Sequence, residues 1–384
     1  MMAINFPDSP TNGQTHLGYV YDGEKWQSLS SSTIGAVRYD AVQGLTANQQ
    51  AQGRSNIGVT KKNYIVNGAM MVSQENGATA VTLANTYPVD QFVINFTGTT
   101  GVVSAAQVAS PTAGGSPNRL RITVTTPDAS LGAGDLFHVS TNLEGLRVSD
   151  LKAGTAFAKT ITIQFGVKAP AGTYCVTIRN GATSNRSYTA EYVIAAGEAN
   201  ADVVKSVTLT LDTTGTWVTD NTASFNISWP LMCGSTFQLA ANTWTAGNLI
   251  ATSSQFNFMG TINNVFELFD VSLTEGSTAP PFVVPDYASE LAACQRYYQK
   301  YVGVLVSGYG AAGANQFDTY LIRPSMRTTP TGSVTGTAPV YSNCSALVVV
   351  PYTETTFTAR VTVTAAGQYY VDTSASSINL NARL

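Results

Sequence analysis

The feature that most constrains this chain is an alternation of apolar and polar residues that recurs from Tyr64 to Phe282. Between Ile161 and Val167, every second residue is apolar and the residues between them are polar or glycine. Side chains of a β-strand point alternately to the two faces of a sheet, so each such run has one apolar face and one uncharged polar face. Turn-rich segments such as "DTTGT" separate the runs. The pattern predicts a mainly β protein built on an antiparallel β-sandwich.

Composition supports this fold class and excludes two kinds of partner. Only 11% of the 384 residues are charged, so Thr, Ser, Asn, Gln and Gly must cover much of the surface. A net charge of −3 provides no basic field for a phosphate backbone, and we therefore expect no nucleic-acid partner. No window reaches the roughly 18 apolar residues of a membrane span, and residues 1–10 lack the pattern of a secretory signal. We expect cytoplasmic synthesis and no membrane insertion.

The residues that usually carry catalysis are scarce. His16 and His138 are the only histidines, and no nucleophile elbow, phosphate-binding loop or zinc-protease motif is present. Four cysteines lie far apart without a C-x-x-C pair, which favours buried free thiols over disulfides and zinc sites. We expect no enzyme activity, no cofactor and no metal ion. A glycosidase is the remaining catalytic alternative, although no spacing pairs two carboxylates for it.

A helix is expected after the main β region, over residues 286–301. Asp286 can cap it, and one side of the helix carries a single seam with spacings of 4, 3, 4 and 3, made of Tyr287, Leu291, Cys294, Tyr298 and Tyr301. That seam needs a partner surface, which is either the chain's own sandwich or a short bundle between subunits. Just before the helix, "VFELFDVSL" shifts its apolar set by one residue, which predicts a β-bulge.

The sequence patterns at the two ends of the chain predict segments separate from the central β region. Residues 1–61 contain a hairpin signal at Asp22-Gly23 and a short polar helix expected from Thr46 to Gly58, with too few apolar residues for independent stability. We interpret them as a docking and trimerisation segment. Further alternating strands predict a small β domain at 302–384, a larger β domain at 62–285 and a connecting helix at 286–301 between them.

Two tryptophans are the candidate ligand-binding residues. Trp217 and Trp244 lie in turn-rich polar segments, where an exposed ring could stack on the apolar face of a sugar. Local packing at the edge of the sandwich is the alternative, and it is the favoured interpretation for each ring.

Several segments resemble known proteins in order along the chain. "NFPDSPTNGQTH" with "YVYDGEKWQS" is similar to the N-terminal ribbon of phage tail and fibre proteins, and "NYIVNGAMMVSQENG" with "FELFDVSLTEGSTAPPF" resembles a jelly-roll module of phage fibres that is similar to carbohydrate-binding modules. "SINLNARL" resembles the last strand of a small fibre tip domain. The resemblance implies a virion fibre or spike protein, a homotrimer, that docks to phage capsid or tail proteins through its N-terminal segment and binds host surface polysaccharide.

Two questions stay open at this stage. The N-terminal segment is short, which leaves attachment to the capsid or to the tail undecided. A purely structural part of the particle, such as a capsid decoration or a fibre connector, is the alternative function, and a polysaccharide depolymerase is a third.

Overall fold

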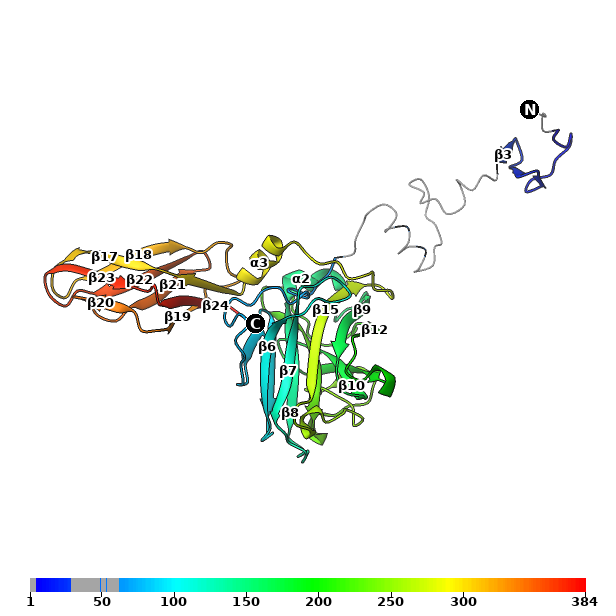
Figure 1. The fold of residues 1–384 in the computed structure, drawn as a ribbon. Coiled ribbons are helices and arrows are strands. Elements are labelled where there is room, and N and C mark those ends of the chain that lie inside the picture. The colour runs from blue at the N-terminus through cyan, green and yellow to red at the C-terminus, as the bar shows by residue number, and fades with distance from the viewer. Residues whose placement is uncertain (1–4, 29–48, 50–52, 54–61) are drawn as a thin grey trace. The chain divides into compact units, whose positions relative to one another are not determined.

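The computed structural model describes residues 5–28, 49, 53 and 62–384, and the chain divides into two compact units, residues 1–60 and 61–384 (Figure 1). In the first unit, the predicted hairpin is confirmed. Tyr21 pairs with Trp26 across a turn in which Gly23 has a φ of 100°, and the Phe6 ring stacks on Trp26 with centroids 5.1 Å apart. The strands of this ribbon are β1 (Thr15–His16), β2 (Tyr19–Tyr21) and β3 (Trp26–Ser28). Of the helix predicted from Thr46 to Gly58, the structure describes only Gln49 and Gly53, both in helical conformation, and the other positions lie outside the described residues.

The second unit begins with a sandwich of two antiparallel sheets, which confirms the predicted fold class. The seven-stranded sheet has the order β14 (Thr245–Ala246), β11 (Arg186–Ile194), β10 (Gly172–Asn180), β13 (Ala223–Cys233), β8 (Leu136–Glu144), β5 (Phe92–Thr97), β4 (Thr86–Val89). The five-stranded sheet, visible face-on in Figure 1, has the order β12 (Val203–Thr210), β9 (Thr160–Lys168), β15 (Val265–Glu275), β7 (Asn118–Thr126), β6 (Val102–Ala109). Short helical turns join the strands, namely α2 (Gly145–Val148), η1 (Ser149–Leu151), η2 (Ala196–Glu198), η3 (Ser235–Phe237) and η4 (Phe258–Gly260).

The alternating residues pack as the sequence pattern requires. The apolar sides of the two sheets form one buried core that contains Phe165, Trp229 and Phe266. The predicted bulge in β15 is confirmed: its register against β9 shifts between Phe269 and Ser272, and Asp270 there has a φ of 49°. The bulge returns the apolar residues that follow it to the core.

The C-terminal residues form a second, smaller β body with its own core. Its three sheets, each of three strands, are β16 (Tyr298–Val302), β24 (Ser376–Asn381), β19 (Thr331–Gly336); β17 (Leu305–Gly310), β23 (Gly367–Asp372), β20 (Val340–Ser342); and β18 (Asn315–Leu321), β22 (Thr356–Thr362), β21 (Val348–Thr353). Phe357 lies at the centre of this core, with Tyr320 stacked on it. Its first strand begins at Tyr298, four residues earlier than the domain boundary expected at residue 302.

The connecting helix is shorter than predicted. Helix α3 (Tyr287–Gln295) begins after Asp286, whose carboxylate accepts a hydrogen bond from the Ser289 backbone N–H at 3.0 Å, so the predicted cap is confirmed. The predicted helical seam through Tyr298 and Tyr301 is wrong, because both tyrosines lie on β16 and pair with β24. Ladder hydrogen bonds to β24 outweigh the helical spacing of these residues.

The last residues of the chain contact the sandwich. The Arg383 guanidinium lies 4.0 Å from the ring centroids of both Tyr87 and Tyr298 and pairs with Glu75. The Asn142 side-chain amide donates to the Leu384 carbonyl at 3.0 Å. The final strand therefore leads directly into a set of cation–π and hydrogen-bond contacts.

The remaining predictions concern cysteines and membrane helices. All four cysteines are free thiols, of which Cys175, Cys233 and Cys294 are buried and Cys344 is half-buried. Burial raises the pKa of Cys233 to about 12, which keeps it protonated. In the parts of the chain that the structure describes, no helix has the length and apolarity needed to cross a membrane.

His138 is buried on the outer side of β8. Burial, aided by the positive charge of Arg179, lowers the pKa of His138 to about 3. The imidazole is therefore neutral in the folded protein at neutral pH, which fits a structural residue better than a catalytic base.

This burial predicts a pH dependence of folding. An unfolded histidine binds a proton below its ordinary pKa, whereas the folded protein excludes it, so the free energy of unfolding should fall as pH drops from about 6.5 toward 3. The contribution is on the order of 1 kcal/mol per pH unit. We expect His138→Gln to reduce the slope of unfolding free energy against pH, measured by urea denaturation between pH 7 and pH 4.5. His16→Gln is the control and should retain the slope; an unchanged slope in His138→Gln would contradict the assignment.

Candidate functional site

The structure brings the two predicted tryptophans together at one side of the sandwich. Trp217 lies in the connection between β12 and β13, and Trp244 directly precedes β14. Their rings meet edge to face, with centroids 5.5 Å apart and an interplanar angle of 87°. The pair therefore packs where an edge strand of each sheet, β12 and β14, leaves the core open.

Trp217 belongs mainly to the core. Only 9% of its surface is exposed, and its ring meets Phe225 edge to face at 5.0 Å. Its indole N–H donates to the Thr214 carbonyl at 3.0 Å, and the indole N–H of Trp244 donates to the Thr210 carbonyl at the same distance. Both polar ends are thus used within the protein, as the local-packing interpretation expects.

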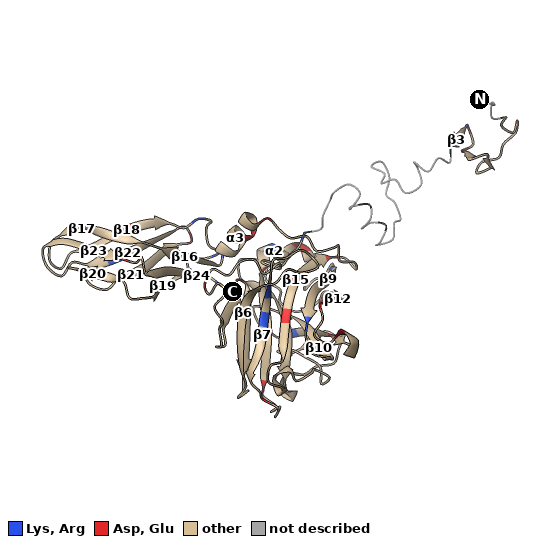
Figure 2. Ribbon diagram, in the orientation of Figure 1, with Lys and Arg blue, Asp and Glu red and all other residues tan. Residues whose placement is uncertain are grey.

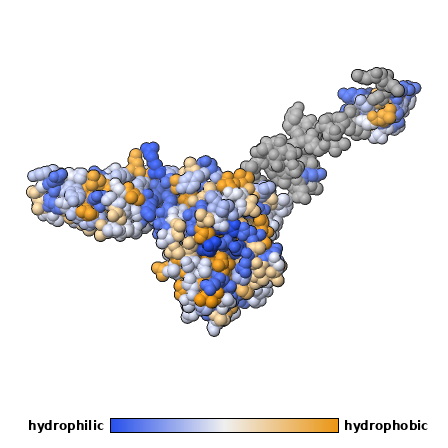
Figure 3. All heavy atoms as spheres, viewed as in Figure 1, coloured by the Kyte–Doolittle hydropathy of each residue, from blue (hydrophilic) through white to orange (hydrophobic). Residues whose placement is uncertain are grey.

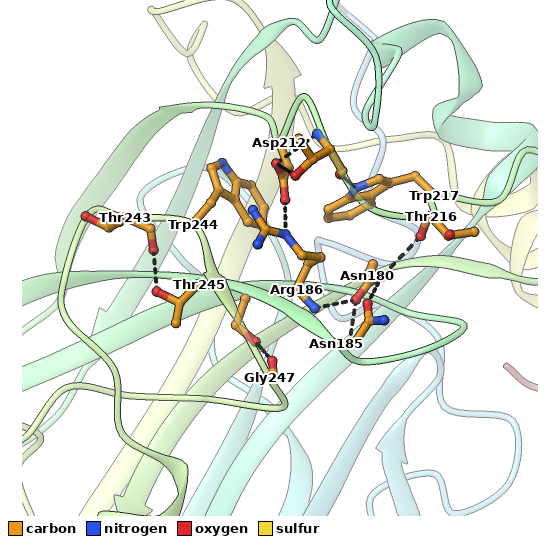
Figure 4. A network of polar contacts seen from close by, with 12 residues as sticks. Asn180, Asn185, Arg186, Asp212, Thr216, Trp217, Thr243, Trp244, Thr245 and Gly247 are labelled. Atoms are coloured by element: carbon orange, nitrogen blue, oxygen red, sulfur yellow. Dashed lines mark hydrogen bonds and ion pairs between the residues drawn. The ribbon is translucent and has the colours of Figure 1, made fainter.

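An ion pair stabilises the loops around the two rings (Figure 4). Arg186 Nε donates to Asp212 Oδ2 at 2.5 Å, and Asp212 Oδ1 accepts from both the backbone and the hydroxyl of Thr214. Burial raises the pKa of Asp212, but the hydrogen bonds from Arg186 and Thr214 outweigh it and leave this pKa lowered. The carboxylate therefore stays charged and fixes the turn that carries Trp217.

The edge of Trp217 borders an open depression of about 570 Å³. On the other side lies Phe157, whose side chain is 75% exposed. The depression is lined by Val148, Ser149, Lys152, Ala153, Gly154, Thr155, Phe157, Gly215, Thr216, Trp217, Val218, Thr219, Ser224 and Phe225. Of these residues only Lys152 is charged, and its ammonium lies 5.6 Å from the centre of the Phe157 ring.

Backbone contacts hold the two loops of the depression in place. The Gly154 N–H donates to the Asp212 carbonyl at 2.7 Å, and a side chain at Gly154 would meet Trp217 Cδ1 at 2.8 Å. The Thr155 hydroxyl donates to the Lys152 carbonyl at 2.8 Å and accepts from the Phe157 N–H at 3.1 Å. Phe157 therefore lies on a tight turn that is held by hydrogen bonds.

The arrangement suits a neutral, hydroxyl-rich ligand. Aromatic rings can stack on the apolar face of a sugar, while the hydroxyls of Thr and Ser residues around them can exchange hydrogen bonds with sugar hydroxyls. The described residues contain no cluster of three or more His, Cys, Asp or Glu side chains suited to a metal ion. The depression offers a ligand ring stacking and hydrogen bonds.

The predicted oligomer seam is divided between different environments. Tyr287 is exposed, Leu291 is half-buried, and Cys294 is buried against Val66 and Val72 of the sandwich. Tyr298 is buried on β16, and Tyr301 packs on the core of the C-terminal body. The five residues therefore form no continuous stripe.

Phe157 was missed by sequence reasoning. It is a single aromatic residue in the Gly- and Ala-containing stretch "KAGTAFAK", outside any alternating strand. This signal could have marked it as a loop aromatic, but its partner Trp217 is 60 positions away and only the fold brings the two together.

The packing predicts different stabilities for three aromatic substitutions. Trp217→Ala removes a core ring and should lower the free energy of unfolding by about 3 kcal/mol or more. Trp244→Ala, at a half-buried ring, should cost about 1–2 kcal/mol. Phe157→Ala should change it by less than about 0.5 kcal/mol, because the ring is exposed. Guanidinium denaturation of the full chain measures all three; equal losses for Trp217 and Phe157 would contradict this description.

No protein-family model matches the sequence, and no curated protein matches it significantly. Among solved structures, the chain is similar to the enzymatically active domain of tailspike protein 4 from bacteriophage CBA120, with a TM-score of 0.30 and 9% identity over 56% of this chain and 21% of that chain. A family 11 carbohydrate-binding module from Clostridium thermocellum gives a TM-score of 0.28 and 12% identity over 52% of this chain and 96% of that module. TmCBM61, solved with β-1,4-galactotriose, gives a TM-score of 0.28 and 8% identity over 56% and 99%.

Proposed function

We propose that this protein is a fibre or spike component of a phage or phage-like particle and that it attaches the particle to polysaccharide on the host surface without catalysis. The observation that carries the proposal is the depression between Phe157 and Trp217, with an exposed ring, surrounding hydroxyls and one charge. The expected location is the virion, with the N-terminal segment docked to capsid or tail proteins. The rival functions remain a structural decoration or connector of the particle and a depolymerase.

The first test of this proposal removes the exposed ring. The full chain, labelled with a fluorophore, is mixed with candidate host cells before and after periodate oxidation of their surface sugars. We expect periodate-sensitive binding that falls about tenfold in Phe157→Ala, because loss of one stacking ring removes on the order of 1–2 kcal/mol. Phe157→Ala is preferred to Trp217→Ala because it should leave folding intact.

The matched control is Leu83→Ala, which truncates another exposed apolar side chain of the sandwich that does not line the depression. It should bind as the unaltered protein does. Cell binding unaffected by both periodate and Phe157→Ala would contradict the adhesin, and release of reducing ends from the polysaccharide would instead support the depolymerase.

We further propose that the protein is a homotrimer, as the resemblance to fibre proteins implies. Support comes from the outer face of the sheet β18–β22–β21, which exposes Phe317, Leu321, Val348 and Tyr352. In the register, Phe317 and Val348 flank Arg360, so these apolar residues share one face. The exposed Arg360 lies between them on β22, and aromatic side chains together with arginine are enriched at interfaces.

Light scattering of the full chain checks the oligomer. We expect the mass of three 40.4 kDa chains at micromolar concentration, and a lower mass for Phe317→Asp because a charge would be buried at the interface. Val193→Asp, which changes an exposed apolar residue of the sandwich, should leave the mass unchanged. A monomeric unaltered protein would rule out the trimer.

A further inference from the structure

Charged residues are scarce in this chain, yet three of them form one row across the outer face of the five-stranded sheet. Glu267 on β15 is in register with Arg121 on β7 and with Lys168 on β9. Their sequence neighbours point into the core, so these three side chains point outward. Figure 2 shows basic residues on β7 beside acidic residues on β15, and Figure 3 shows a hydrophilic patch with hydrophobic surroundings on this face.

A neighbouring arginine in the same patch is fully used by the fold. Arg119 donates from Nη1 and Nη2 to Asp202 at 2.6 and 2.7 Å and from Nη1 to Glu267 at 3.0 Å. Its remaining N–H groups donate to the backbone carbonyls of Ser110 and Pro111, and its guanidinium lies 4.5 Å from the centre of the Phe269 ring. Arg119 has no donor left for a ligand. Its role is to hold the buried Glu267 in place.

Arg121 and Lys168 are in the opposite situation. Arg121 donates from Nε to Glu267 at 2.6 Å, and its Nη groups have no hydrogen-bond partner among the described residues. The Lys168 ammonium has neither an ion pair nor a hydrogen bond to any residue that the structure describes. The patch contains three positively charged side chains (Arg119, Arg121 and Lys168) and two negatively charged ones (Asp202 and Glu267). One positive charge is therefore uncompensated.

These two cations line a depression of about 420 Å³. Its walls also carry Thr123, Asn200, Asn263 and Asn264. Asn200 and Asn263 have φ values of 58° and 64°, a conformation that asparagine tolerates, and their side-chain amides have no partner in the described parts of the chain. Each free carboxamide offers both donors and an acceptor, which matches the hydroxyl groups of a sugar.

We propose that this depression binds an acidic saccharide, with the ligand's carboxylate taken up by Lys168 and the Nη groups of Arg121 and its hydroxyls by the asparagine amides. Because Glu267 holds Nε, the guanidinium of Arg121 is already oriented before the ligand arrives. The inference rests on the proposed function only for the class of ligand. It shares no residue with the depression at Phe157, so either site can fail alone.

The test measures binding of the full chain to defined acidic oligosaccharides by calorimetry. The probes are oligomers of galacturonate, glucuronate, mannuronate and N-acetylneuraminate, each compared with its carboxyl-reduced counterpart. We expect at least one acidic oligomer to bind about tenfold more tightly than its reduced form, and Lys168→Gln to remove that difference. Added salt should weaken binding of the acidic oligomer and leave binding of its reduced form unchanged.

Two control variants decide where the ligand binds. Lys205→Gln removes the same charge from the same sheet, but Lys205 is already paired with Glu198 at 2.9 Å and does not line the depression, so binding should persist. Phe157→Ala should also keep acid-dependent binding, even if host-cell attachment is lost. Equal affinity for every acidic oligomer and its reduced form, or acid-dependent binding that survives Lys168→Gln, would overturn the inference.

Discussion

One continuous layer of aromatic contacts holds the two sheets of the sandwich together. Trp229 on β13 meets Phe92 of its own sheet at 6.2 Å and Phe165 of the opposite sheet at 5.8 Å. From Phe165 the contacts continue to Tyr192 and then to Tyr174. Large buried rings supply much of the apolar area that stabilises a fold, and edge-to-face geometry adds to it. Both candidate sites depend on this layer because it fixes the strands that carry them.

The layer also explains why the two sites differ in chemistry. At the side of the sandwich the core is closed by Trp217 against Phe225, and the depression beyond it is lined by one charged residue, Lys152, among uncharged ones. On the outer face of the five-stranded sheet, the same strands that bury Phe266 turn Glu267 outward. A carboxylate there needs partners, and the arginines of β7 provide them. The depression at Phe157 thus lies at the edge of the core. The depression at Lys168 lies on the outer face of strands whose inner face forms the core.

Much of the fold was predictable because alternation and turn chemistry act locally. The β-sandwich, the bulge after Phe269 and the cap at Asp286 all follow from residues within a few positions of one another. The end of helix α3 was not predictable in this way, since Tyr298 joins a strand whose partner lies more than 80 residues later. The candidate sites were harder to predict from the sequence. The row of Arg121, Glu267 and Lys168 can be recognised only when the registers of β15 with β7 and with β9 are known. The sequence could mark Phe157 as a loop aromatic, but its exposure and its place in the depression beside Trp217 are seen only in the fold.

The row of Arg121, Glu267 and Lys168 is important because charged residues are scarce in this chain. With 11% of residues charged, most of this surface can offer a ligand only neutral hydrogen bonds, which are individually weak because water competes for them. A site that binds by such contacts needs several copies acting together, and the proposed trimer would supply them. An uncompensated cation beside the side-chain amides of Asn200 and Asn263 can bind a ligand more strongly, because a charge-assisted hydrogen bond is about twice as strong as a neutral one. The depression at Phe157 is therefore suited to repeated weak contacts, and the row of Arg121, Glu267 and Lys168 is suited to discriminating between ligands by their charge.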